Sequence, residues 1–387
     1  MEVKKLKECC TIIAGQSPES KYYNSNGDGL PFFQGKADFG ELYPSIRVYC
    51  SQPTKIAEKD DILLSVRAPV GPTNLAPCKV CIGRGLTAIR PSEVLLTRYV
   101  LLFFRYFEAQ LASKGTGTTF KAITQDVVKN LEIPIPPLPE QERIVARIEE
   151  LFSQLDAGVE TLEKTKAQLV VYRQAVLKEA FEGDYPRKQL KEFSKAISGF
   201  AFKSSRYSPD GNYVVVKIGN VKERHFDFSR DLTKTLEADD SILEKYLLRR
   251  GDCLITLTGS RGKRDYGFVA MVGNQNNYLL NQRVAALRFD QSVALPEFFQ
   301  YYLASPSYRD MFFGYETGNV GQGNVGIKAL LDPYVILPDI DTQKRIVEDV
   351  EDRLSVCDSI EQTVDTALQQ AEAMRQSILK DAFEGRL

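Results

Sequence analysis

The sequence predicts an α+β fold in which two α/β domains alternate with two long helices that pair as an antiparallel coiled coil. Two observations carry this prediction. The chain of 387 residues contains one internal repeat, which gives the fold a pseudo-two-fold symmetry. Each copy closes with a proline-free stretch in which apolar side chains recur every seven residues, a period typical of a coiled-coil seam.

The repeat is clearest in the helical segments. Residues 141–183 align with residues 343–385 without a gap, and 17 of the 43 aligned positions are identical. The preceding segments align more loosely, with an offset that grows from 184 to 202 residues, because loops in globular domains absorb insertions. The sequence therefore predicts four segments: domain 1 at 1–137, a helix at 138–183, domain 2 at 184–336 and a second helix at 337–387.

The predicted seam contains one apolar residue per heptad in each helix. These residues are Ile148, Leu155, Leu162, Leu169 and Val176, then Val350, Cys357, Val364, Ala371 and Ile378. The companion positions are Ile144, Leu151, Phe152, Val159 and Tyr172, then Ile346, Leu354, Ile360, Leu368 and Met374. A glycine is expected to end each helix, Gly183 and Gly385. The alternative is that the two segments are core helices of one bundle.

The order of the segments predicts the direction of the helices. Domain 2 begins where the first helix ends, and the second helix leaves the same domain, so a shared seam requires the second helix to run back along the first. A helix of this length spans up to roughly 65 Å, which is close to two turns of B-DNA, about 68 Å. Such a chain would suit a DNA target with two half-sites and a gap.

The two domains are predicted to contain short strands, an aromatic-rich helix, a glycine-rich loop and a final strand. The strands are expected at 62–66, 86–89 and 131–135, then at 213–218, 254–257 and 334–337. The aromatic-rich helices are expected at 98–111 and 296–303.

Composition excludes several functional classes. The chain is 43% hydrophobic and 26% charged, as in ordinary folded domains, and no apolar run is long enough to span a membrane. The N-terminus lacks the apolar core of a signal peptide, and the odd number of cysteines, seven, fits a reducing cytoplasm. A hydrolase triad or a histidine-based metal site needs imidazoles, and the one histidine is His225. We therefore expect a cytoplasmic protein that is not an enzyme by itself.

Charge differs between the segments. The chain has a net charge of −1, but domains 1 and 2 each carry +4, while the helices carry −3 and −6. Basic domains fit contact with phosphates, and acidic helices fit contact with proteins.

Three features of the sequence argue against cofactors in this chain. Gly321–Gly326 has GxGxxG spacing, but no strand precedes it and no βαβ unit follows, so a DNA-contacting loop or a turn fits better than a dinucleotide site. Cys78 and Cys81 form a CxxC pair without the two further ligands that structural zinc requires. No GxxxxGKS or GxxxxGKT phosphate loop is present, so ATP hydrolysis is not expected.

Contact with DNA would use loop residues with basic, amide or hydroxyl side chains. Ser260–Arg264 is the densest basic loop, and Gly115–Lys121 is a loop of domain 1 with hydroxyls and a lysine suited to phosphate. The candidate DNA-binding residues are Lys36, Arg67, Arg84, Lys114, Thr116, Thr118 and Lys121 in domain 1, and Lys217, Asn220, Arg261, Lys263, Arg264, Gln282, Arg283, Asn319, Gln322 and Asn324 in domain 2.

Several motifs resemble those of the specificity subunits of type I restriction-modification enzymes. They are Gly-Gln-Ser-Pro at 15–18, Asp-Ile-Leu-Leu-Ser-Val-Arg-Ala-Pro at 61–69, Pro-Ile-Pro-Pro-Leu-Pro-Glu-Gln at 134–141, and Ala-Phe-Glu-Gly at the close of both helices. The resemblance covers the whole chain in the order target-recognition domain, helix, target-recognition domain, helix. Residues 337–343 depart from the proline-rich pattern that opens the first helix.

This resemblance implies a non-catalytic subunit that binds double-stranded DNA. Each domain would read one half of a split, asymmetric target, and the paired helices would set the gap. Two modification subunits, which bind adenosylmethionine and methylate adenine, and two motor-nuclease subunits, which use ATP and magnesium, would assemble on it. The acidic helix surface would be the docking face for the modification subunits, through Glu149, Glu160, Glu351 and Glu361.

Three alternatives remain open at the level of sequence. The chain could serve a related two-subunit system that cuts beside its target, or be a coiled-coil tether that joins two protein-binding domains without DNA. A dinucleotide enzyme is the third. Binding to DNA through phosphates weakens steeply with salt, which separates the tether from a DNA-binding subunit.

Overall fold

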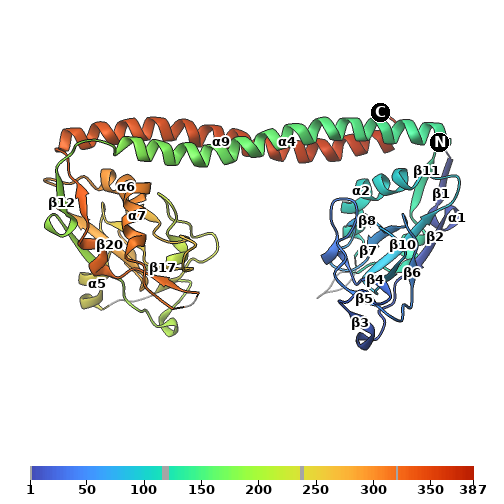
Figure 1. Ribbon diagram of the computed structural model, residues 1–387, viewed down its shortest axis with the longest axis horizontal. Helices are drawn as coiled ribbons and strands as arrows, with labels where there is room; N and C mark the ends of the chain where they lie inside the picture. The colour runs from blue at the N-terminus through green and yellow to red at the C-terminus, as the bar shows by residue number, and fades with distance from the viewer. Residues whose placement is uncertain (1, 116–121, 236–238, 320) are drawn as a thin grey trace. The chain divides into compact units, whose positions relative to one another are not determined.

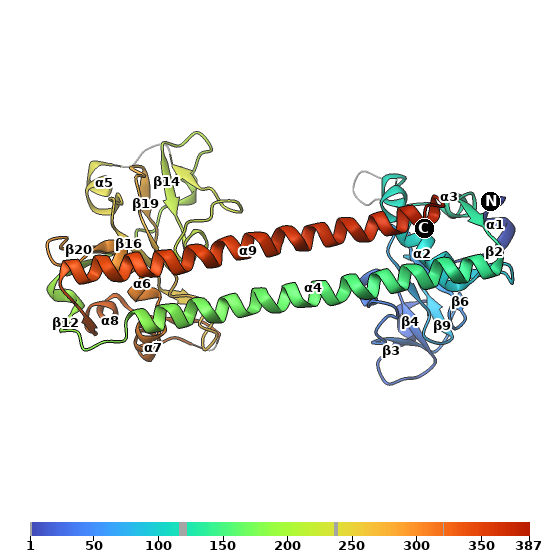
Figure 2. The ribbon, with the colours of Figure 1, turned by 90° about the horizontal axis from the view of Figure 1, so that it is seen from above.

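The computed structural model describes residues 2–115, 122–235, 239–319 and 321–387. It divides into two compact units. The first unit combines Met1–Glu163 with Asp365–Leu387, and the second is Lys164–Val364. Each unit therefore contains one mixed domain and a part of both long helices (Figure 1, Figure 2). Among the described residues, no helix has the length and apolar character needed to cross a membrane.

Domain 1 contains a central antiparallel sheet in the order β2-β10-β7-β8, a sheet β3-β5-β4-β9-β6 in which β4 and β9 are parallel, and a pair β1-β11. Its strands are β1 (Glu2–Lys5), β2 (Cys10–Ala14), β3 (Tyr23–Asn24), β4 (Leu30–Phe33), β5 (Tyr49–Cys50), β6 (Ile56–Ala57), β7 (Ile62–Ser65), β8 (Thr73–Leu75), β9 (Val80–Ile82), β10 (Leu86–Pro91) and β11 (Glu132–Ile135). Its helices are α1 (Leu6–Cys9), α2 (Thr97–Ser113) and α3 (Gln125–Lys129).

Domain 2 repeats this plan with the sheet β13-β20-β16-β18, the sheet β15-β14-β19 in which β14 and β19 are parallel, and the pairs β12-β22 and β17-β21. Its strands are β12 (Arg187–Gln189), β13 (Ser194–Ser198), β14 (Tyr213–Val216), β15 (Lys234–Thr235), β16 (Cys253–Thr256), β17 (Thr258–Gly259), β18 (Val269–Met271), β19 (Tyr278–Leu280), β20 (Val284–Phe289), β21 (Gly323–Asn324) and β22 (Tyr334–Ile336). Its helices are α5 (Asp240–Tyr246), α6 (Pro296–Ala304), α7 (Pro306–Gly314) and α8 (Ile327–Leu331). The predicted strands and aromatic-rich helices of both domains are confirmed, with bounds that differ by up to two residues at each end.

The long helices are α4 (Leu138–Ala180) and α9 (Ile340–Phe383), and they run antiparallel within each unit. In the first unit, Arg375 of α9 forms an ion pair with Asp156 of α4. In the second unit, Arg173 of α4 pairs with Asp358 of α9 at 2.6 Å. Asp156 and Asp358 are equivalent in the repeat, and so are the two arginines. The same interhelical ion pair is therefore made twice, and the predicted antiparallel coiled coil is confirmed.

The predicted seam is largely correct. All ten seam residues are buried or half-buried, with Ile148, Val176 and Val350 fully enclosed. Three companion positions are wrong, because Tyr172, Ile360 and Met374 are 47%, 40% and 55% exposed. Two paired helices cover only a narrow stripe on each other, and these side chains lie outside that stripe.

The helix ends are only partly as predicted. Gly385 adopts a left-handed conformation with φ of +75°, as a glycine after a helix commonly does, whereas Gly183 is not left-handed. The altered start of the second helix has a local explanation. The Asp339 carboxylate accepts hydrogen bonds from the Thr342 N–H at 2.9 Å and from the Thr342 hydroxyl at 2.8 Å, which caps α9 and lowers the pKa of Asp339.

A buried glutamine near the start of each long helix fixes the helix to its own domain. The Gln141 Oε1 atom accepts a hydrogen bond from Leu96 N–H at 2.9 Å, and its Nε2 donates to the carbonyls of Val94 and Pro136, both at 2.8 Å. Gln343, its repeat equivalent, makes the same three bonds with Leu295 N–H and the carbonyls of Val293 and Pro338. Both glutamines are 0% exposed.

A phenylalanine at the end of each long helix packs against the domain at that end. Phe181 of the second unit lies edge-on to Phe298 and Tyr302 of α6, with ring centroids 5.3 and 5.2 Å away. Phe383 of the first unit contacts Tyr99, Phe103 and Tyr106 of α2 within 5.6 Å. The Ala-Phe-Glu-Gly sequence at the close of both helices is thus explained by its phenylalanine, which joins the core of a domain.

Two repeat-equivalent glycines allow close backbone contact at the end of the first central strand. A Cβ atom on Gly199 would lie 1.8 Å from the Asn281 carbonyl oxygen, and one on Gly15 would lie 2.1 Å from the Gly83 carbonyl oxygen. Both contacts are with backbone atoms, which cannot rotate away.

We expect the substitution Gln343→Met to lower the free energy of unfolding by about 3 kcal/mol. It keeps the side-chain volume but leaves one N–H and two carbonyls buried without partners, and each such group costs roughly 1–3 kcal/mol. Urea denaturation followed by circular dichroism measures the change. Gln168→Met, at an exposed position of α4, is the matched control and should change stability by less than about 0.5 kcal/mol. Equal stability of the two variants would contradict this role.

We expect Gly199→Ala to destabilise the second unit by about 2–3 kcal/mol, because the added methyl group displaces the backbone at Asn281. Gly219→Ala is the control, since no atom lies within 4 Å of the added Cβ there. Thermal unfolding of the two variants side by side tests this expectation, and a Gly199→Ala variant as stable as Gly219→Ala would refute it.

Candidate nucleic-acid interface

In both domains, three chain segments meet beside the first residue of a central strand, β10 or β20. In domain 1 the Gly85 carbonyl accepts from Val66 N–H and the Val66 carbonyl accepts from Ile123 N–H, each at 3.0 Å. In domain 2 the same frame joins Arg283 to Leu257 and Leu257 to Val325, each at 2.9 Å. We call this frame and its loops the loop edge; it comprises residues 65–69, 83–85 and 122–123 in domain 1, and 257–266, 281–283, 315–319 and 321–326 in domain 2.

The loop edge of domain 1 presents separated basic side chains. Arg67 and Arg84 lie on it and are exposed, and Arg67 forms a β-bridge with Ala122. The backbone N–H of Arg84 donates to the Ser17 hydroxyl at 3.2 Å, and Ser17 in turn contacts the Gln34 amide at 2.9 Å. Lys36 is exposed two residues beyond Gln34. The structure thus joins the Arg84 backbone to Ser17 and Gln34, whereas the charge of Lys36 acts on Glu108 of α2.

The structure describes only one of the candidate residues in and before the loop that follows α2. Lys114 is exposed at the end of α2, and its ammonium lies 5.3 Å from the centre of the Phe107 ring. Thr116, Thr118 and Lys121 lie outside the described residues.

The loop edge of domain 2 gathers most of the candidates. Strands β17 and β21 pair as a short ribbon, with Thr258 opposite Asn324, and this ribbon places the loop with Arg261, Lys263 and Arg264 beside the loop with Asn319 and Gln322. These side chains are exposed, and Asn324 is half-buried. The GxGxxG sequence therefore belongs to an antiparallel ribbon, which does not have the strand-turn-helix geometry of a dinucleotide site.

Gln282 and Arg283 complete this edge. Both are exposed, and Arg283 holds a left-handed backbone with φ of +71°, as Arg264 does with φ of +53°. Non-glycine residues in this conformation are uncommon and concentrate at functional sites.

Two further candidates lie beside this edge in different settings. Lys217 follows β14, pairs with Asp231 at 3.1 Å and lies over the Tyr207 ring. Asn220 is only 1% exposed, and its amide donates to the carbonyls of Asp227 and Asp231 while its Oδ1 accepts from Lys217 N–H. Asn220 therefore has no free polar group for a base, and we assign it to holding its loop.

All four glutamates expected at a docking face have interactions within the chain. Glu149 binds Arg98 at 2.9 Å, Glu361 binds Arg173 at 2.8 Å, and Glu351 accepts a long hydrogen bond from Tyr301 at 3.4 Å. Glu160 is exposed on α4 and also has an interaction within the chain.

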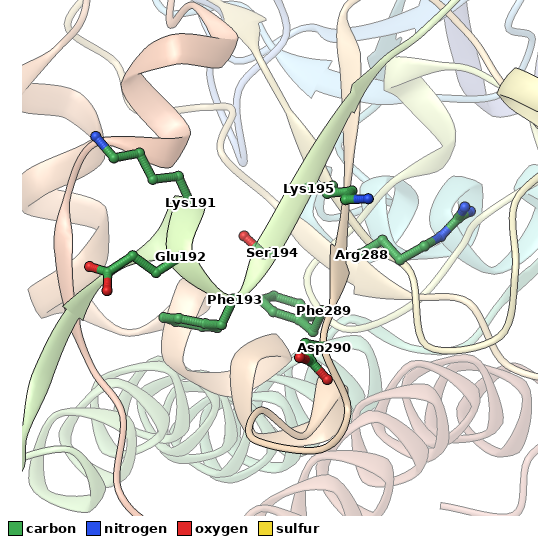
Figure 3. Close-up of a pocket in the computed structure, with 8 residues that line it drawn as sticks. All are labelled: Lys191, Glu192, Phe193, Ser194, Lys195, Arg288, Phe289 and Asp290. Carbon is green, nitrogen blue, oxygen red and sulfur yellow. The ribbon is translucent and has the colours of Figure 1, made fainter.

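A surface hollow of about 430 Å³ lies at the opposite end of β20 from Arg283 (Figure 3). Lys195 and Arg288 line one side, and Phe193 and Asp290 line another. Arg288 is already bound through two 2.7 Å hydrogen bonds to Asp252, which is buried. This pair repeats Arg90 and Asp61 of domain 1, so it belongs to the shared framework of the domains. Within the described residues no cluster of three or more potential metal ligands is present.

The chain matches the family model described as Type I restriction modification DNA specificity domain over residues 1–169 and 182–370. A putative type I restriction enzyme MjaX specificity subunit of Methanocaldococcus jannaschii is 42% identical over 163 residues, which are 41% of this chain and 38% of that relative. The type I restriction enzyme EcoKI specificity subunit of Escherichia coli strain K12 is 27% identical over 332 residues, covering 80% of this chain and 70% of that one. The first of these alignments thus spans well under two thirds of the relative.

Two solved structures share the fold across the chain. One, from a study of complex assembly and conformational transition of the type I R-M system, has a TM-score of 0.77 and 21% identity, covering 100% of this chain and 98% of that chain. The other, the HsdS subunit from Thermoanaerobacter tengcongensis, has a TM-score of 0.56 and 21% identity, covering 100% and 97%. The family model spans both domains and most of both long helices, so the chain belongs to the type I restriction-modification specificity family, as a non-catalytic DNA specificity subunit.

Proposed function

We propose that this chain reads a split, asymmetric DNA target, with one half-site contacted by the loop edge of each domain. The repeated frame is the observation that carries the proposal. The same backbone hydrogen bonds hold both edges, but the side chains on them differ, with Arg84 in domain 1 where domain 2 has Gln282. Arginine favours guanine and glutamine favours adenine in the major groove, so the two half-sites would differ in sequence.

We propose further that the chain works inside a complex. Two modification subunits with adenosylmethionine and two motor-nuclease subunits with ATP and magnesium would supply the chemistry. Because the predicted docking glutamates are all engaged within the chain, we propose that exposed apolar residues of the second unit, such as Val356 and Ile360 on α9, contact a modification subunit instead. A coiled-coil tether without DNA binding is the alternative function.

Co-expression with the neighbouring modification subunit in a host without adenine methylation tests the main proposal. Mapping of modified adenines across the genome should give one split motif with a fixed gap. Arg84→Ala should relax only the half-site of domain 1, and its matched variant Gln282→Ala only the half-site of domain 2, by roughly tenfold in base discrimination. A soluble, assembled complex that modifies no motif would favour the tether.

The length of the paired helices is proposed to set the gap. Seven residues inserted after Glu163 and seven after Val364, the two positions at which the chain passes from one compact unit to the other, keep the heptad register. They should lengthen the gap by about three base pairs, since seven helical residues span roughly 10 Å and one base pair about 3.4 Å. The same mapping measures the gap.

The matched control for the gap is a chain with the insertion in α4 alone, which should fail to pair its helices and give no motif. New half-site sequences with an unchanged gap in the doubly inserted chain would show that the helices are not the spacer.

A further inference from the structure

Arg309 of α7 contacts the backbone of the basic loop Ser260–Tyr266, which is part of the loop edge of domain 2. Its guanidinium donates hydrogen bonds to the carbonyls of Gly267 at 2.8 Å, Arg264 at 2.9 Å and Tyr266 at 3.1 Å. It also lies over the rings of Phe268 and Phe313, 5.8 and 5.2 Å from their centres. Figure 1 shows α7 and the ribbon strand β17 close to each other in domain 2.

The contacts of Arg309, a half-buried cation, are unusual. Its hydrogen bonds within the described chain go to backbone carbonyls, and burial lowers its pKa. A buried charge is costly unless its donors are satisfied. The guanidinium reaches these carbonyls from two nitrogens of a rigid plane, Nη1 for Gly267 and Nη2 for Arg264 and Tyr266, whereas the three donors of a lysine ammonium all leave one nitrogen. We therefore assign Arg309 the role of holding these three loop carbonyls in place.

The loop backbone is left-handed at three positions, of which Arg264 alone is not a glycine and is therefore strained. Gly262, Arg264 and Gly267 all have left-handed conformations, with φ of +75°, +53° and +74°. Two carboxylates add to the support. Asp265 accepts from Ser260 N–H at 2.7 Å, hydrogen bonds from the Ser260 side chain and backbone lower the pKa of Asp265, and Glu316 accepts from the Tyr266 hydroxyl at 2.8 Å. The loop is thus held in one shape before any ligand arrives.

The basic side chains of the loop have different tasks. Arg264 pairs with Asp310 at 2.7 Å and lies over Phe313, and Arg261 donates to the Gly318 carbonyl at 2.8 Å. Both arginines are therefore used to fasten the loop to its surroundings. Lys263 is exposed, and its ammonium makes no hydrogen bond or ion pair with the described residues, although its charge contributes to lowering the pKa of Asp265. Lys263 is the cation that the fastened loop presents outward.

We propose that Arg309 is a positioning residue for DNA binding, which holds the loop so that the Lys263 ammonium contacts a phosphate of the half-site read by domain 2. This inference rests on the proposed function. The sequence of the loop alone points to Arg261 and Arg264 as strongly as to Lys263, and their contacts within the chain separate the three.

The test uses the complex of this chain with its modification subunit and a duplex that carries the mapped target. Affinity is measured over a series of salt concentrations. Lys263→Gln should weaken binding roughly three- to tenfold at physiological salt and reduce the salt slope by about one, as expected for one lost phosphate contact. Arg309→Met and Arg309→Lys should have the same effect, because neither replaces the planar guanidinium. The double variant Arg309→Met with Lys263→Gln should bind within about twofold of Arg309→Met alone.

The controls separate positioning from damage to the fold. Lys195→Gln changes an exposed lysine at the hollow of Figure 3 and should leave affinity and slope unchanged. Weaker binding by Arg309→Lys with an unchanged salt slope would overturn the proposal, as would effects of Arg309→Met and Lys263→Gln that multiply in the double variant. Salt-independent or absent DNA binding by the unsubstituted complex would instead contradict the proposed function.

Discussion

The attachment of each long helix to its domain depends on one buried side-chain amide. Gln141 and Gln343 each satisfy one backbone N–H and two carbonyls in the interior, so a buried glutamine is stabilising here although polar groups usually avoid such sites. All three partners are backbone groups, and the bonds therefore do not depend on the identity of the residues that supply them. This allows the loops of a domain to vary in sequence while the direction in which the helix leaves it stays fixed.

In the two loop edges, too, backbone hydrogen bonds fix the position of the loops and leave the side chains free to differ. Backbone bonds from Val66 to Gly85 and from Leu257 to Arg283 place the loops, while the exposed side chains are left to differ. Domain 1 connects Arg84 with Ser17 and Gln34, whereas domain 2 extends its edge into the β17-β21 ribbon. Because the backbone frame is the same in both domains and the exposed side chains differ, the two loop edges fit a DNA target whose half-sites differ in sequence.

Sequence could predict the features that have a period and could not predict those that depend on distant contacts. The repeat and the heptads predicted the two long helices, because periodicity records burial directly, and the order of the segments predicted their direction. Asn220 looked like a base reader, yet only the folded loop shows its amide bound to two carbonyls. Arg309 was missed because its partners lie 42 to 45 residues earlier. Ser17 had a visible signal, the Gly-Gln-Ser-Pro motif, but its contact with Arg84 spans 67 residues.

The order of the segments makes the helices antiparallel, and the repeated ion pairs agree with that direction and help to fix the register. If α4 and α9 lay parallel with equivalent residues side by side, Asp156 would face Asp358 and Arg173 would face Arg375, so like charges would meet. Only the antiparallel arrangement brings each aspartate to an arginine, as in the pairs Asp156 with Arg375 and Asp358 with Arg173. Partly exposed pairs of this kind contribute about 0.2–1 kcal/mol each, which is too little to hold the helices together. The buried seam residues, such as Val350 and Cys357, provide the stability, and the ion pairs select one of the arrangements that the seam alone would allow.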